Sequence, residues 1–125
     1  MVLVAGLLAA GCGQDTSSLA PVRGRVYFKG EPLRGGVVVF VPDTARGGHG
    51  PPLAFAAIQS DGTYEVRTEG EAGVVPGWHR VTVTSSPEAE AAGQRLPPRY
   101  ASPESSGLSH EVLTGQDNVI DLHLD

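Results

Sequence analysis

The sequence predicts an all-β sandwich, and three observations carry that prediction. Short strand-like runs alternate with turn signals at intervals of about ten residues, the rhythm of a sandwich. The 17 Gly and 10 Pro of this 125-residue chain fall between those runs, which favours tight turns over long helices. Only residues 88–92 look helical, and they are expected to form one turn at most. Hydrophobic residues make up 40% of the chain, enough for one domain to form a core without disulfides or a metal.

The strands are expected where β-branched and aromatic residues gather between turn signals. They are residues 22–28, 36–41, 53–59, 63–68, 78–84, 108–113 and 119–124. The run 36–41 is apolar throughout, so we expect it to be buried on both faces, and Asp61-Gly62 is expected to form a hairpin turn. The expected core is Val26, Phe28, Val39, Val66, Val81, Val83, Ile120, Leu122 and Leu124.

The N-terminal segment has the pattern of a secretory signal. Residues 1–11 are uncharged and nearly all apolar or small, and they are too few to span a bilayer, which takes about twenty residues. Leu8-Ala9-Ala10-Gly11-Cys12 resembles the lipobox of bacterial lipoproteins, in which the chain is cleaved before a cysteine that carries a diacylglyceryl group. Cys12 is the only cysteine, so it cannot form an internal disulfide. We therefore expect a lipoprotein signal peptide at 1–11 and lipidation of Cys12.

Two features of this signal depart from the usual lipobox. Ala9 stands where a branched residue is usual, and no Lys or Arg precedes the apolar run. One explanation is that translation starts upstream of Met1, and the alternative interpretation is a free thiol in an apolar leader. Residues 12–20 are small and polar, which predicts a flexible tether, and residues 21–125 are expected to form the domain.

From Pro21 to the end, several motifs in the same order resemble the carboxypeptidase regulatory-like domains of the transthyretin-like group, in a bacterial lipoprotein branch. They are Val22-Arg23-Gly24-Arg25-Val26, Gly30-Glu31-Pro32-Leu33, residues 37–41, Asp61-Gly62-Thr63-Tyr64, residues 76–83, Leu96-Pro97-Pro98-Arg99-Tyr100, Ser106-Gly107-Leu108 and residues 118–122. The resemblance implies a seven-stranded antiparallel Greek-key sandwich of prealbumin-like or immunoglobulin-like form. It also implies that the domain is not catalytic.

Catalytic and metal-binding patterns are weak in this sequence. His79, His110 and His123 fall on different expected strands, and none begins a His-x-x-Glu or His-x-x-x-His pair, so solvent-facing side chains are the simpler interpretation. The hydroxyisourate hydrolases of the transthyretin fold end in Tyr-Arg-Gly-Ser, whereas this chain ends Leu122-His123-Leu124-Asp125. There is no Gly-x-Ser-x-Gly elbow. We expect no enzyme, no metal and no cofactor.

Three further features have a functional and a structural interpretation. Asp61 could ligate calcium with Asp43 or Asp117, but the hairpin turn accounts for it. Trp78 could stack against a sugar or pack in the core. The loop 44–52 could recognise a ligand or simply connect two strands.

The expected function follows from the anchor and the charge. The net charge is −5 and the nine Lys and Arg are scattered, which argues against nucleic acid or anionic headgroups as partners. We expect a non-catalytic lipoprotein of the bacterial cell envelope, membrane-bound through its lipid, whose sandwich is a structural or interaction module for an envelope protein or glycan. The alternative is a small-ligand or carbohydrate-binding module that uses Trp78 or Gly47-Gly48-His49-Gly50.

Lipidation of Cys12 predicts that the mature protein begins at that residue. Its intact mass after detergent extraction should lack residues 1–11 and include added diacylglycerol and acyl mass. Cys12→Ala should release the domain from the membrane without unfolding it, because the tether lies outside the expected core. A soluble periplasmic product with an unmodified Cys12 would contradict the prediction.

Overall fold

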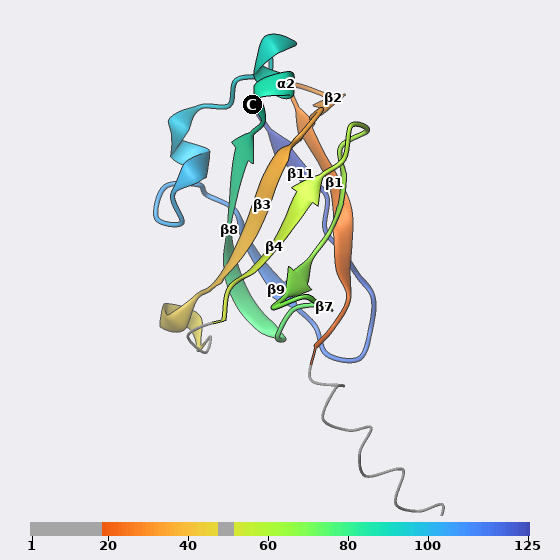
Figure 1. Cartoon of the computed structure of the whole chain (residues 1–125). Coiled ribbons are helices and arrows are strands. Elements are labelled where there is room, and N and C mark those ends of the chain that lie inside the picture. Colours follow the sequence, from red (N-terminus) through yellow and green to blue (C-terminus); the bar gives the residue numbers. More distant parts are fainter. Residues whose placement is uncertain (1–18, 48–51) are drawn as a thin grey trace, which may run out of the picture.

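The computed structural model describes residues 19–47 and 52–125, which fold into two packed β-sheets (Figure 1). The strands are β1 (Val22–Phe28), β2 (Glu31–Pro32), β3 (Gly36–Pro42), β4 (Ala54–Ile58), β5 (Thr63–Glu65), β6 (Arg67–Thr68), β7 (Glu71–Ala72), β8 (Gly77–Ser85), β9 (Ser109–Val112), β10 (Asn118–Val119) and β11 (Leu122–Leu124). The helices are η2 (Thr44–Arg46), α2 (Pro87–Ala91) and η3 (Pro98–Ala101). The predicted all-β class is confirmed.

The first sheet is built on β1, and the second has the order β7-β6-β4-β3-β8-β9. In the first sheet β2 and β5 pair antiparallel with β1, whereas β10 and β11 pair with it in parallel. Val26 is opposite Leu122 in that parallel ladder. The prediction of purely antiparallel sheets was therefore wrong at this place. A parallel pair needs a long crossover connection, and here nearly the whole domain lies between the two paired strands.

The core lies between the inner faces of the two sheets. Eight of the nine predicted core residues are buried: Val26, Phe28, Val66, Val81, Val83, Ile120, Leu122 and Leu124. The prediction for Val39 was wrong, since that side chain is only half-buried. Val38 and Phe40 are buried instead, because β3 has one face on the core while Val37, 39% exposed, lies on the other. The apolar run 36–41 is thus buried on one face only.

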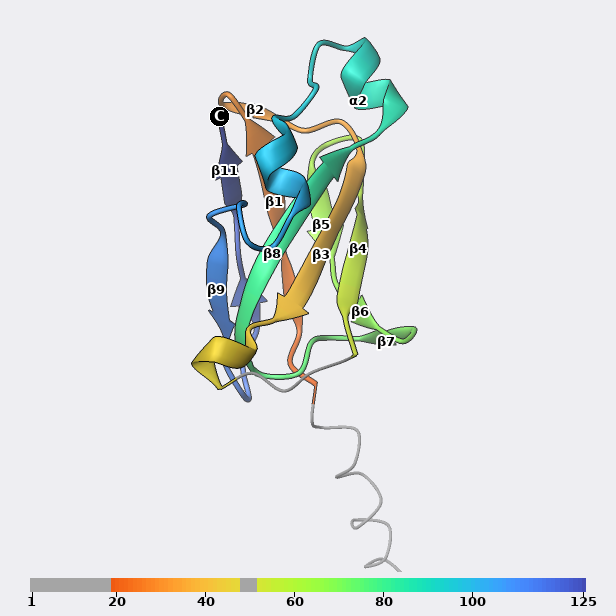
Figure 2. The ribbon, with the colours of Figure 1, turned by 90° about the vertical axis from the view of Figure 1, so that its left-hand side faces the viewer.

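The segment after β8 covers one end of the sandwich with α2 and then runs along its side with η3 (Figure 2). It contains α2, which matches the predicted helical turn and is capped by the Ser86 hydroxyl accepting from the Ala89 N–H. Leu96 and Tyr100 join the core from this segment, and η3 packs against β8. The Tyr100 hydroxyl lies 2.9 Å from Oδ1 of Asp125, so the segment also contacts the residue that follows β11. The short helices η2 and η3 had no sequence signal.

Truncation of Leu122 should test the core directly. Leu122→Ala leaves a cavity at a residue only 1% exposed and should lower the free energy of unfolding by about 2–5 kcal/mol. The matched change Val119→Ala, at a side chain 56% exposed, should cost no more than about 0.5 kcal/mol. Denaturant unfolding of both variants measures the difference, and equal costs would contradict this packing.

Candidate functional site

Several predicted site residues lie outside the described part of the chain. They are the signal peptide at 1–11, Cys12 and His49. Ala20, the last residue of the expected tether, is 2% exposed and forms two backbone hydrogen bonds with Val74, of 2.9 and 2.8 Å. Ala20 is therefore part of the folded domain.

Two of the candidate histidines are neighbours. His79 is opposite His110 in the β8–β9 ladder, and Nδ1 of His79 lies 2.9 Å from the Gly77 carbonyl oxygen. Burial lowers the pKa of both imidazoles below the ordinary 6.5, partly opposed at His79 by that hydrogen bond. His123 lies on β11 in the other sheet, where its ring stacks on Tyr27. Among residues 19–47 and 52–125, no three His, Cys, Asp or Glu side chains are placed to share a metal ion.

The candidate aspartates have separate structural tasks. The Asp61 carboxylate accepts the backbone N–H and the hydroxyl of Thr63 at 3.0 and 2.6 Å, and these bonds lower the pKa of the carboxyl. Asp43 is buried, accepts the Ala45 N–H at 3.1 Å and contacts Nε of Arg80 at 3.3 Å. Asp117 is exposed. The structure does not bring them together, and the turn interpretation of Asp61 accounts for its contacts.

Trp78 is half-buried beside η2. The Arg46 guanidinium lies 4.5 Å from the centroid of its ring, a cation–π contact that already covers one face. Trp78 is therefore neither fully buried in the core nor fully open for stacking against a sugar.

A hairpin that is open in its middle forms the most distinctive surface feature. At its turn, the Gln59 N–H donates to the Thr63 carbonyl at 2.8 Å. At its other end, Phe55 on β4 is opposite Arg67 on β6. The pairs Gln59–Thr63 and Phe55–Arg67 belong to the same antiparallel register. In that register Ala57 would lie opposite Glu65. Those middle positions are not paired with each other, and at this point β5 follows β1 in the first sheet.

The opening has an identifiable cause on the side of the first sheet. The Val66 N–H donates to the Val22 carbonyl at 3.0 Å, and the Tyr64 hydroxyl donates to the Ile120 carbonyl. Both side chains are buried, Val66 at 0% exposure and Tyr64 at 3%. Burial raises the pKa of the Tyr64 hydroxyl, which is consistent with its role as the donor in this bond. The strand 63–66 is thus held by the first sheet while β4 stays in the second.

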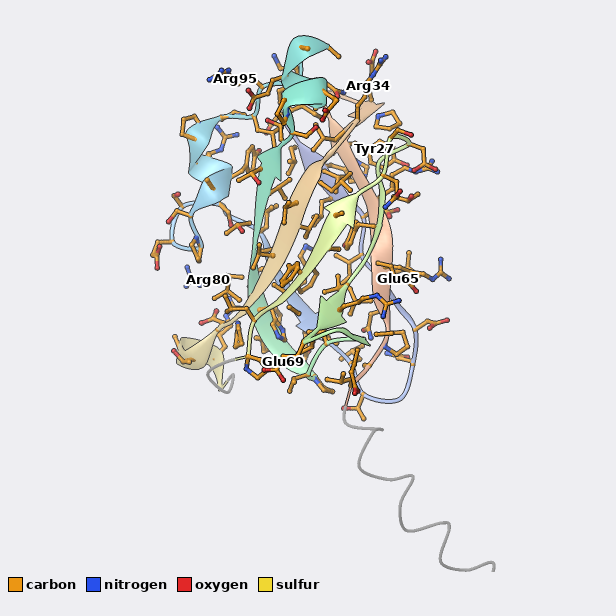
Figure 3. All side chains as sticks on the ribbon, viewed as in Figure 1. Tyr27, Arg34, Glu65, Glu69, Arg80 and Arg95 are labelled. Atoms are coloured by element: carbon orange, nitrogen blue, oxygen red, sulfur yellow. The ribbon has the colours of Figure 1, made fainter. Side chains whose placement is uncertain are left out.

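A groove of about 880 Å³, open to solvent, lies over this opening. One wall is β4, where Phe55 is 59% exposed and is followed by Ala56 and Ala57. The other wall consists of side chains of β1 and β5, among them Tyr27 and Glu65, which project on this side of the molecule (Figure 3). The groove therefore lies between an apolar strand and a polar sheet face.

Three of the nine basic residues of the chain line this groove: Arg23, Arg25 and Arg67. The Arg25 guanidinium lies 4.0 Å from the Asp61 carboxylate, while Arg67 donates to the Gly70 carbonyl at 3.1 Å. Arg23 and Arg67 form no ion pair with any residue that the structure describes. The lining carboxylates are Glu65 and Asp121, so the groove is locally positive in a chain of net charge −5.

Two contacts hold the polar wall in shape. The Asp121 carboxylate accepts the Arg25 backbone N–H at 3.0 Å, and so is already used within the sheet. A Cβ at Gly24 would collide with the Ile120 carbonyl, which explains why glycine stands within this strand. At the upper end of the wall, the Tyr27 and His123 rings stack at 4.8 Å with 5° between their planes. This wall is therefore a packed and hydrogen-bonded surface.

The groove residues had no functional signal in the sequence. Phe55 lies within the expected strand 53–59, and Arg67 alternates with Tyr64 and Val66 as in any half-buried strand. The alternation fixes which side chains point inward but does not tell which sheet their strand joins.

Comparison with known proteins does not assign the chain to a family. No family model, no curated protein and no solved structure matches the chain. The resemblance to carboxypeptidase regulatory-like domains is thus neither supported nor contradicted by a relative. No helix in the described part of the chain is long and apolar enough to cross a membrane.

The His79 and His110 pair predicts a loss of stability in mild acid. Because their pKa values are lowered in the folded state, the unfolded chain takes up protons at higher pH than the folded one. The free energy of unfolding should therefore decrease as the pH falls below about 6.5. The free energy of unfolding should be measured with denaturant between about pH 5 and 8. Asp61 and Glu104 have lowered pKa values, so these carboxyls titrate below this pH range.

Replacing both histidines with Gln should remove most of that pH dependence. Trp78→Phe, at the neighbouring position of β8, keeps both imidazoles and should retain it. An unchanged dependence in the double variant would contradict the assignment.

Proposed function

We propose that this chain is a non-catalytic lipoprotein of the bacterial cell envelope whose β-sandwich is an interaction module, with the groove beside β4 as its contact surface. The lipobox-like segment before Cys12 supports the anchor, and the groove supports the contact surface. The single observation that carries the interaction module is the hairpin opened between β4 and β5, which places an open groove beside the exposed side chain of Phe55.

The open shape of the groove favours a macromolecular partner. Sites for small molecules usually enclose most of their ligand within about 300–1,000 Å³. The groove has a volume in that range, but it is open along the side of the sandwich and extends over both sheets. A protein segment or a glycan of the envelope suits such a surface better than an enclosed small ligand.

The number of main strands and their topology are also part of this proposal. We infer a seven-stranded Greek key, as in carboxypeptidase regulatory-like domains. Only one residue separates β5 from β6, and two residues separate β10 from β11, so each of these pairs counts as one strand. With the two-residue strands β2 and β7 counted as extensions, the main strands are then β1, β3, β4, β5–β6, β8, β9 and β10–β11.

The small-ligand or carbohydrate-binding module remains the second candidate, and one observation favours it. Phe55 is an exposed aromatic residue beside polar side chains of the groove, as a sugar-binding surface requires. Trp78 supports it less, because Arg46 covers one face of its ring.

Photo-crosslinking in the envelope tests the proposed contact surface. A benzophenone side chain in place of Phe55 should form a covalent adduct with a partner on irradiation, because that position is exposed in the groove. The same group in place of Glu88, exposed on α2 at the end of the sandwich, is the control and should form far less adduct. Equal adducts at both positions, or none at either, would contradict the assignment of the groove.

A further inference from the structure

We infer that the outer face of the second sheet binds an amphipathic α-helix of a partner protein, which carries acidic residues beside its apolar stripe. This inference rests on the proposed function, because it names the chemistry of the partner and extends the contact surface from Phe55 onto the neighbouring strand. Three properties of this face carry it: its apolar surface, its charge and its backbone pairing.

An apolar strip lies on the side of β3 and β4 that faces away from the core, where the two strands run side by side (Figure 1). It consists of Val37, Val39, Val41, Phe55 and Ala57, which alternate with buried residues along their strands. Val39 is opposite Phe55, and Val37 is opposite Ala57, so the two strands contribute to one continuous strip. Single exposed apolar residues are normal on a protein surface, whereas a contiguous group marks an interaction site.

The strands around this apolar strip carry only positive charge. β6, β4, β3 and β8 are consecutive in the sheet, and none of them contains Asp or Glu, although the chain has 14 such residues. Arg67 on β6 is opposite Phe55, and Arg80 on β8 is opposite Val41. These two arginines therefore lie on opposite sides of the apolar strip.

Arg67 is the arginine that can bind a partner. Arg80 already contacts Asp43, whereas Arg67 has no ion-pair partner among the described residues. Its Nη1 donates to the Gly70 carbonyl, and a guanidinium has five N–H donors in all. Arginine binds carboxylates through paired, charge-assisted hydrogen bonds. A carboxylate beside the apolar stripe of the partner therefore suits this position.

This composition is that of a protein interface rather than of a membrane-binding surface. The centres of interfaces are enriched in aromatic residues and Arg, and they are depleted of Lys, Glu and Asp. The four strands contain Phe55, Trp78 and two arginines, with no Lys, Glu or Asp. Binding to an anionic leaflet usually depends on a cluster of Lys and Arg. One unpaired arginine is too few for that.

The backbone pairing and the width of the apolar strip favour a helix as the partner. Residues 36–40 of β3 are paired with β4 on one side and with β8 on the other, so they offer no free backbone groups. A partner that covers them must satisfy its own N–H and C=O groups, as an α-helix does. Neighbouring strands lie about 4.8 Å apart, so two strands give a strip about 10 Å wide, close to the diameter of a helix. On β8 the strip ends at the polar Thr82 and Thr84.

The same charges disfavour a second copy of this chain as the occupant. A symmetric dimer through this face places the same surface of both copies together. The arginines of both copies would then meet with no carboxylate from these four strands between them, and their like charges would repel. A different partner that carries carboxylates has no such conflict.

Defined peptides test this inference on the soluble Cys12→Ala protein. The probe is a capped peptide of about 18 residues with Leu along one helical face and Glu on both sides of it. Calorimetry should detect binding, and the amide chemical shifts of Val37, Val39 and Phe55 should change. Lys in place of Glu should weaken binding by about tenfold or more, and Pro at the centre should abolish it, because Pro interrupts the helix. Unchanged shifts in β3 and β4, or equal binding of all three peptides, would overturn the inference.

Two matched pairs of protein variants locate the contact. Val37→Glu and Arg67→Glu should each weaken the acidic peptide by about tenfold or more. Val119→Glu makes the first change at an exposed residue of the groove in the other sheet, and Arg34→Glu makes the second at an exposed residue outside the groove and the strip. Both controls should leave affinity unchanged, and thermal unfolding confirms that each variant is folded. If Val119→Glu weakens binding as much as Val37→Glu, the apolar strip is not the site.

Crosslinking in the envelope separates this inference from the proposed function. A benzophenone side chain in place of Val37, which does not line the groove, should form an adduct with the same protein as one in place of Phe55. An adduct at Phe55 without one at Val37 leaves the groove as the contact surface and contradicts the helix-binding face, and so does an adduct with a glycan. If neither position forms an adduct, the proposed function itself fails.

Two measurements test the other occupants of this face. The soluble Cys12→Ala protein should sediment as a monomer, and it should not sediment with vesicles of phosphatidylglycerol. A dimer that Val37→Glu dissociates would identify a second copy as the occupant. Vesicle binding that Val37→Glu abolishes would identify the membrane. Either result would overturn the inference of a partner helix.

Discussion

The division of strand 63–68 between the two sheets is the constraint on which the rest of the surface depends. Its first half is held by β1 through the Val66 N–H and the Val22 carbonyl, whereas its second half, β6, pairs with β4. One chain segment thereby joins the two layers of the sandwich at this side. The consequence is that β4 loses its neighbour at Ala56 and Ala57, and a groove lies where a closed hairpin would have been.

Burial explains why the strand is divided rather than fully paired with β4. Tyr64 and Val66 both place their side chains in the core, and the Tyr64 hydroxyl finds an acceptor in the Ile120 carbonyl. A buried hydroxyl without a partner costs about 1–3 kcal/mol, so this bond favours the arrangement in which the strand follows β1. Gly24 contributes by leaving room for the same carbonyl. The groove is thus a result of core packing, and its walls are rigid elements rather than a loop.

Much of the fold could be predicted from residue patterns, and little of the groove. The alternation in 22–28 and the Asp61-Gly62 turn gave correct local structure, because side-chain period and turn chemistry are local properties. Val39 was misplaced because an unbroken apolar run does not tell one buried face from two. The parallel pairing of β1 with β11 and the division at Val66 depend on contacts between distant segments, which no local pattern encodes. For the same reason Phe55 and Arg67 gave no sign that they line one surface.

The central claim is that this hairpin is open in its middle while it is closed at both ends. Nuclear Overhauser contacts between backbone protons of opposite residues measure this directly in solution. We expect contacts across Phe55 and Arg67, and between Glu65 and Arg23, with none between Ala57 and Glu65. Strong backbone contacts between Ala57 and Glu65 would mean that the hairpin closes in solution, and that the groove beside β4 does not exist.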